Sequence, residues 1–246
     1  NPNVWADGTS KGFLFGHWHG QATYNITGSL LAENTYIELA YTAEDQLVDI
    51  DGGTVKTKAL YAQYGNGTHT VKLRNGGTLE VAEILSTGHA LTKEFKYGTF
   101  RVTADATETR AINFSAASGY ATTLDPYGNT LTLQSAALTG SGDITVADSS
   151  DGHAGKVVFV GGSGYTGRLI MTDANAANID ISGYTGTVLC QGTAAATIAM
   201  FNGFAGTVYF TGNVDATGIN LSGATVHIAD GCTFTADAGS EGTLVL

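Results

Sequence analysis

The chain has 246 residues, of which 43% are hydrophobic and 13% are charged. This balance excludes an intrinsically disordered chain, which has too few apolar residues to build a core. The 22 acidic residues outnumber the 11 basic ones and give a formal net charge of −11. We therefore expect no nucleic-acid partner, because phosphate binding requires clustered Lys and Arg. The sequence contains no run of about 18 apolar residues, so we expect no direct membrane insertion.

Residues 1–50 show the weakest periodicity in the chain. Both tryptophans lie in residues 1–20, and segments 22–31 and 35–41 have the composition of strands. His17 and His19 are two positions apart and share one face of a strand, where a third ligand would complete a Zn²⁺ or Cu²⁺ site. No such ligand stands at a diagnostic spacing. We predict no metal and no cofactor, and interpret the histidines as part of a packed cap.

From residue 51 onward, a glycine-threonine motif followed by alternating apolar residues recurs. It occurs at 52–57, 76–81, 97–102 and 127–133, with spacings of 24, 21 and 30 residues. The pattern predicts a strand at each position, joined by turns of variable length. We expect the longer loops at 61–68, 86–97 and 103–127, and such loops are where binding residues collect.

The clearest repeat lies between residues 163 and 221. Three copies of one pattern, Ser163-Gly164-Tyr165-Thr166-Gly167, Ser182-Gly183-Tyr184-Thr185-Gly186 and Asn202-Gly203-Phe204-Ala205-Gly206, are 19 and 20 residues apart. An apolar run follows each copy, at 168–171, 187–190 and 207–210, and again at 225–228. A second run falls at 157–160, 178–181, 197–200 and 218–221. Each period therefore predicts two short strands.

A fixed period of this length is typical of stacked units that cannot bury their apolar face alone. We predict an all-β, single-stranded parallel β-helix (solenoid) with coils of about 20 residues or more and longer loops in the N-terminal half. The usual hand of parallel crossovers predicts a right-handed helix. Residues 1–50 would form the cap and first coils, and residues 51–246 the repeats, in one continuous domain.

Aromatic residues supply the candidates for ligand contact. Tyr165, Tyr184 and Phe204 share one repeat position and should stack; we interpret this ladder as buried, with an exposed platform for sugar rings as the alternative. Aromatic residues in or near the irregular segments are the better candidates for ligand binding. They are Trp5, Trp18, Tyr61, Tyr64, Tyr97, Tyr120 and Tyr127.

Carboxylates and thiols offer weaker signals. Asp49 and Asp51 share a strand face about 7 Å apart, a separation that suits glycoside hydrolysis. Asp143, Asp148 and Asp151 flank a glycine-rich turn, and turn formation and solvation explain such residues equally well. We assign no catalytic residue. The two cysteines, Cys190 and Cys232, are interpreted as buried free thiols acting as small apolar residues.

Several segments resemble a known family. Gly-Asn-Thr-Leu-Thr-Leu at 128–133, Leu-Thr-Gly-Ser-Gly-Asp-Ile-Thr-Val at 138–146, Gly-Gly-Thr-Leu-Glu-Val at 76–81 and the Ser-Gly-Tyr-Thr-Gly copies are similar to the β-helical passenger domains of bacterial autotransporters and to autotransporter-associated β-strand repeats. The resemblance covers residues 50–246. It implies an exported protein, extracellular or on the bacterial cell surface, and carries no catalytic residues to transfer.

On these grounds we expect a bacterial surface β-helix that acts as an adhesin, a stalk or a glycan-binding module, with a glycan or another host or cell-surface ligand as partner. One alternative is a polysaccharide-active enzyme, a glycoside hydrolase or lyase, or the carbohydrate-binding module of such an enzyme. A phage tail spike component is a further alternative. The last residues, 242–246, have the pattern of mid-strand, so we expect a fragment of a longer protein.

Overall fold

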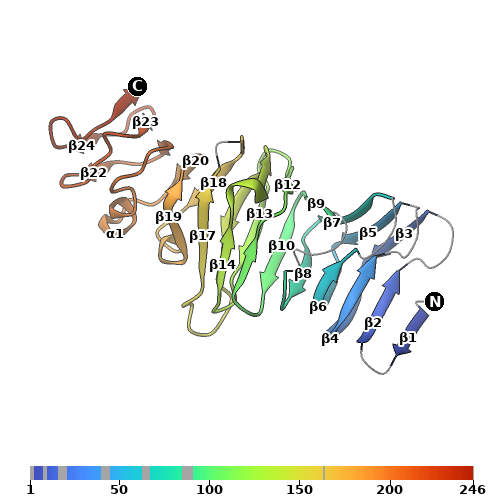
Figure 1. The fold of residues 1–246 in the computed structure, drawn as a ribbon. Helices are drawn as coiled ribbons and strands as arrows, with labels where there is room; N and C mark the ends of the chain where they lie inside the picture. The colour runs from blue at the N-terminus through green and yellow to red at the C-terminus, as the bar shows by residue number, and fades with distance from the viewer. Residues whose placement is uncertain are drawn as a thin grey trace.

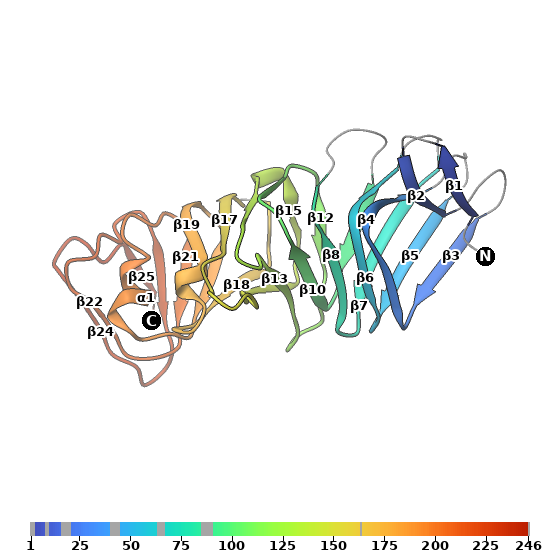
Figure 2. The same ribbon diagram turned by 90° about the horizontal axis from the view of Figure 1, so that it is seen from below.

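The computed structural model describes residues 3–7, 10–15, 21–39, 45–62, 67–84, 91–162 and 164–245. In this part of the chain the backbone winds into an all-β parallel β-solenoid of about nine turns, with coils of about 23 residues. The coils stack into an elongated body with the N- and C-termini at opposite ends (Figures 1 and 2). The predicted solenoid is confirmed, and its right-handed sense stays a prediction.

One long sheet runs through the whole solenoid. Its strands, in spatial order, are β1 (Asn3–Asp7), β2 (Ser10–Phe15), β4 (Ser29–Leu39), β6 (Thr54–Tyr61), β8 (Gly77–Val81), β10 (Gly98–Val102), β13 (Ala121–Asp125), β16 (Asp143–Val146), β18 (Arg168–Met171), β20 (Thr187–Cys190), β21 (Thr207–Phe210), β23 (Thr225–Ile228) and β25 (Thr243–Val245). Among the described pairs only β1 and β2 are antiparallel.

The remaining sides of the coils change along the axis. A six-stranded sheet covers the N-terminal coils with β3 (Ala22–Ile26), β5 (Gln46–Asp51), β7 (His69–Arg74), β9 (Leu91–Phe95), β12 (Ile112–Phe114) and β15 (Leu138–Gly140). A four-stranded sheet follows, with β11 (Ala106–Glu108), β14 (Thr130–Leu133), β17 (Lys156–Gly161) and β19 (Ile179–Tyr184). The last coils carry β22 (Val214–Ala216) and β24 (Phe234–Ala236), and the short helices are η1 (Ser135–Ala137), η2 (Ala176–Asn178) and α1 (Ala195–Ala199).

Apolar residues stack in rows inside the solenoid. Because side chains alternate across a strand, every second residue of the long sheet points inward. One inner row runs through Val55, Leu79, Phe100, Leu124 and Val146, which are paired in register and buried. A fully buried aliphatic side chain contributes about 2 kcal/mol, so these rows supply the stability that a single coil lacks.

The Ser-Gly-Tyr-Thr-Gly motif builds one corner of the coil. The aromatic ring of each copy lies against the glycine two residues later and is at least 96% buried, which confirms the buried interpretation of the ladder. The pairs are Tyr165 with Gly167, Tyr184 with Gly186 and Phe204 with Gly206. A Cβ atom at Gly186 would lie 2.4 Å from Tyr184 Oη, closer than non-bonded atoms allow. In the next coil Ser222 takes the aromatic position and Ala224 the glycine position, so ring and glycine are lost together.

Some predicted strands were wrong. Residues 197–200 belong to α1 and its end, because the alanine-rich segment 194–199 favours a helix over a strand. Residues 217–218 form a turn, and residues 219–221 have no regular secondary structure. The motif at 127–133 contributes β14 to the four-stranded sheet, and the strand stacked on β10 is β13 instead. The expected loop at 103–127 therefore contains β11, β12 and β13.

Helices contribute little to this fold. The α-helix α1 has five residues. Within the described residues, no helix has the length and hydropathy needed to cross a bilayer.

Candidate functional site

The outer face of the long sheet presents polar side chains in rows that follow the solenoid axis. Thr54, Thr78, Thr99, Thr123 and Thr145 are paired in register from β6 to β16. All five are half-buried, with their side chains on the solvent side of the sheet. The parallel stacking of strands, about 4.8 Å apart, therefore turns one motif position into a continuous line of hydroxyl groups.

A ladder of alternating charges runs beside the threonine row. Lys56, Glu80, Arg101 and Asp125 occupy successive strands in register. Lys56 Nζ lies 3.5 Å from Glu80 Oε1, and Arg101 Nη1 lies 3.0 Å from Glu80 Oε2. Arg101 Nε lies 2.8 Å from Asp125 Oδ2. Opposite charges directly across neighbouring strands stabilise their pairing.

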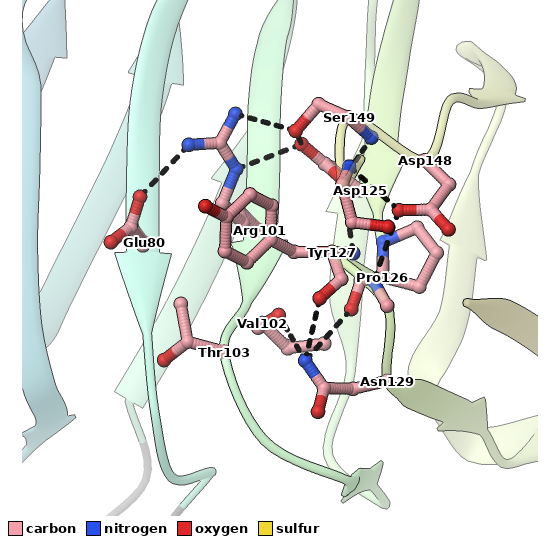
Figure 3. A network of polar contacts seen from close by, with 12 residues as sticks. Glu80, Arg101, Val102, Thr103, Asp125, Pro126, Tyr127, Asn129, Asp148 and Ser149 are labelled. Atoms are coloured by element: carbon pink, nitrogen blue, oxygen red, sulfur yellow. Dashed lines mark hydrogen bonds and ion pairs between the residues drawn. The ribbon is translucent and has the colours of Figure 1, made fainter. Parts of the chain in front are cut away.

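Arg101 is the centre of this ladder (Figure 3). Its guanidinium donates to Glu80, to Asp125 and to Ser149 Oγ, the last at 3.0 Å. Burial lowers the pKa of Arg101, but the carboxylates of Asp125 and Glu80 raise it, and the net pKa lies above the ordinary arginine value. The cation is therefore permanent, and it lies 4.9 Å from the ring centroid of Tyr127.

A well-bonded turn holds Tyr127 over Arg101. Tyr127 has a φ of 47°, which is uncommon outside glycine. Asp125 Oδ1 accepts the backbone N–H of Tyr127 at 3.0 Å, and Asn129 Nδ2 donates to the Tyr127 carbonyl at 2.9 Å. The turn thus fixes an aromatic ring that is 44% exposed beside the polar rows, just after the C-terminal end of β13.

Asp148 stabilises the same turn from the next coil. Its carboxylate accepts backbone N–H groups of Gly128, Ser150 and Gly155 at 3.0, 3.0 and 2.6 Å. Burial raises the pKa of Asp148, but these hydrogen bonds lower the pKa by more than burial raises it. The net pKa therefore lies below the ordinary aspartate value. Asp148 therefore has a structural role, because its carboxylate links the backbones of two coils.

Two exposed tyrosines meet on the opposite side of the rows, at the N-terminal ends of β10 and β13. Tyr97 precedes β10 and Tyr120 precedes β13, and stacking of these coils brings their ring centroids to 4.8 Å with the planes tilted by 52°. The rings are 40% and 53% exposed. Tyr97 lies four residues before Arg101, about 13 Å along a strand. The rows of hydroxyls and charges therefore run between an aromatic pair and the single ring of Tyr127.

No family model, curated protein or solved structure matches this chain. The case for a function therefore depends on the geometry of its surface.

The predicted ligand-binding residues separate into three groups. Tyr97 and Tyr120 form a pair, and Tyr127 lies apart from them on the same outer face. Trp5 belongs to β1 and Tyr61 ends β6, but their side chains lie outside the described part of the structure. Trp18, Tyr64, His17 and His19 lie outside the described residues altogether.

The charge ladder was missed from the sequence, although a signal was present. Lys56, Glu80 and Arg101 each follow the threonine of their Gly-Thr motif by two positions. Charges of alternating sign at one position of a repeat predict cross-strand ion pairs. Asp125 carried no such signal because its strand, β13, lacks the Gly-Thr motif.

The acidic pair considered for hydrolysis is bridged by an arginine. Arg74 Nε lies 2.9 Å from Asp49 Oδ1, and Arg74 Nη2 lies 2.8 Å from Asp51 Oδ2. Asp143 pairs with the Arg168 guanidinium in the same manner. Ion pairing accounts for these carboxylates without a catalytic role. In the described segments, no three His, Cys, Asp or Glu side chains gather into a group able to hold a metal ion.

The two cysteines are free, and they differ in burial. Cys190 lies in the core, where burial raises the pKa of its thiol to about 11. Cys232 is half-buried with its Sγ 3.7 Å from the Thr211 carbonyl oxygen. The interpretation as buried thiols is thus confirmed for Cys190 and wrong for Cys232, which follows a glycine turn near the surface.

Proposed function

We propose that this chain is the glycan-binding part of an exported bacterial surface β-helix, used in adhesion. The observation that carries the proposal is the exposed Tyr97–Tyr120 pair, which lies beside the polar rows of the long sheet at the N-terminal ends of β10 and β13. A tyrosine ring offers an apolar face of the size of a sugar ring and a hydroxyl that still reaches water. Two such rings from adjacent coils form a small platform that a saccharide chain can lie on.

The residues beyond the pair favour an extended ligand over a single sugar. From Tyr97 the outer face continues through Thr99 to Arg101, and from Tyr120 through Thr123 to Asp125. Threonine hydroxyls donate and accept hydrogen bonds, as sugar hydroxyls do. We therefore expect a glycan chain to lie along β10 and β13, with one residue on the tyrosine pair and others over the threonines.

A glycan-array screen of the purified chain tests the proposal. The Tyr97→Ala/Tyr120→Ala double variant should lose binding to the glycans that the wild type recognises, by about tenfold or more, which corresponds to about 1.4 kcal/mol. Tyr97→Phe keeps the aromatic face and should retain most of the affinity. Mass spectrometry of bound polysaccharides tests the enzymatic alternative, because cleavage would yield shorter products.

Tyr209 provides the matched control. It is 39% exposed on β21 of the same sheet, in the C-terminal coils. Tyr209→Ala removes one ring with nearly the same exposure as that of Tyr97 and should leave glycan binding unchanged. Equal loss in Tyr209→Ala, or full binding by the double variant, would contradict a site at Tyr97 and Tyr120. Absence of any glycan ligand would favour a stalk.

A further inference from the structure

An ion pair lies inside the solenoid where neighbouring coils carry apolar residues. Lys93 on β9 is stacked between Val71 and Ile112, in a row that points into the core. Glu108 on β11 is stacked against Leu133, which is fully buried. The two charged side chains are 13% and 1% exposed. They are therefore removed from the water that usually surrounds such groups.

The pair is arranged as a nucleophile beside a polarised carboxyl group. Lys93 Nζ lies 2.5 Å from Glu108 Oε2. The other oxygen, Oε1, accepts the backbone N–H of Arg110 at 2.9 Å. A backbone N–H on one carboxyl oxygen stabilises negative charge that develops there during attack on the carboxyl carbon. The second oxygen, next to the amine, is then the one able to leave.

A small cavity borders the pair and leaves room for water. A cavity of about 30 Å³ is lined mainly by apolar side chains, among them Leu60, Leu79 and Phe100, and Lys93 and Glu108 belong to its wall. Charged groups lose hydration in such surroundings, so the amine and the carboxyl group face each other with few competing water molecules. The volume suffices for about two water molecules.

We propose that Lys93 and Glu108 join covalently, through an amide bond between Lys93 Nζ and the Glu108 carboxyl carbon. One proton moves from the ammonium to Oε2, the amine lone pair attacks the carboxyl carbon, and the tetrahedral Oε1 is held by the Arg110 N–H. The C–Oε2 bond then breaks, and Oε2 leaves as water with a second proton from the nitrogen. The ammonium and carboxylate together thus give one amide and one water, with no oxidant, reductant or co-reactant.

Such a bond would close a ring within one coil. It would tie β9 in the six-stranded sheet to β11, the first strand of the four-stranded sheet. Cross-links of this kind restrict the unfolded chain, as a disulfide does. This one would also persist in a reducing environment.

Intact-mass spectrometry of the denatured wild-type protein tests the proposal. The measured mass should fall below the mass of the sequence by one water molecule. Trypsin requires a free lysine side chain, so cleavage after Lys93 should be absent, and a branched peptide containing residues 93 and 108 should appear. A wild-type mass equal to that of the sequence would overturn the proposal.

The chain offers two controls. Lys93→Arg keeps the cation but removes the amine nucleophile, so its mass should equal that of its own sequence. Lys58 and Glu83 form an exposed ion pair, 3.1 Å apart with side chains 37% and 41% exposed, and Lys58 should stay unlinked, so that trypsin cleaves after it. A water deficit in Lys93→Arg, or a link at Lys58, would show that the loss arises elsewhere and would also overturn the proposal.

Discussion

Replacing Gly186 with alanine tests the corner formed by an aromatic ring and a glycine. Gly186 does not lie in the left-handed region of φ, so alanine fits the backbone, and the cost comes from the ring. The new Cβ would lie 2.4 Å from Tyr184 Oη and 2.5 Å from Cζ. The ring must then move by about 1 Å in a packed core, where overpacking costs about 1–3 kcal/mol.

The companion variant removes the ring. Tyr184 is 2% exposed and packs 5.6 Å from Phe159, measured between ring centroids. Tyr184→Ser should therefore cost about 3–5 kcal/mol on its own. In that background Gly186→Ala meets no ring and should cost nothing, or stabilise the fold by about 0.5 kcal/mol through the stiffer unfolded chain. This double variant reproduces Ser222 and Ala224, which occupy the same positions two coils further along the solenoid.

Urea unfolding of the four proteins measures the coupling between the two positions. We expect the double variant to be more stable than the sum of the single effects predicts, by about 1–3 kcal/mol. If Gly186→Ala lowers the free energy of unfolding equally with and without Tyr184, the ring is not the reason why the repeat has a glycine there. The explanation of the repeat would then be wrong.

Further predictions concern charge and thiol chemistry. Asp148→Asn should cost about 1–2 kcal/mol at pH 7; because the folded-state pKa is lowered, this difference should shrink as the pH falls below about 4, the unfolded value. With the Cys190 pKa raised to about 11, a thiol reagent at pH 8 should label only Cys232 in the native protein and both cysteines in urea. Arg101→Ala should cost about 3 kcal/mol because the buried Asp125 carboxylate loses its cation, whereas the exposed Arg168→Ala should cost about 1 kcal/mol or less.

Each of these three predictions has an outcome that would contradict it. Equal stability losses for the two arginine variants would mean that burial does not set the strength of the ladder. Labelling of both thiols in the native protein would place Cys190 at the surface. An undiminished effect of Asp148→Asn at pH 3 would show that the carboxylate charge is not what the turn binds.

Regular periods made much of the long sheet predictable. The runs at 168–171, 187–190, 207–210 and 225–228 coincide with β18, β20, β21 and β23, because a fixed spacing and a period-2 alternation agree there. The helix at 195–199 was missed because apolar content alone does not separate a short strand from a helical turn. The motif at 127–133 does contain a strand, β14, but local pattern does not say which side of a coil a strand occupies.

The candidate site was harder to predict, since stacking creates it. Tyr97 and Tyr120 are 23 residues apart and become neighbours only when the coils have the right lengths. Lys93 gave no signal because residues 86–97 were expected to form a loop, and β9 lies within them. A lysine is unusual inside a core, but this becomes visible only once the strand is known.

The parallel stack also determines how the protein would respond to a pull on its two ends. The hydrogen bonds between coils run along the axis, so tension along the axis pulls coils apart one after another instead of shearing all strands together. A coil adds about 4.8 Å to the folded length, whereas its roughly 23 residues extend to about 80 Å. Each coil that opens would therefore lengthen the chain by about 75 Å, and the solenoid would unfold in steps instead of all at once.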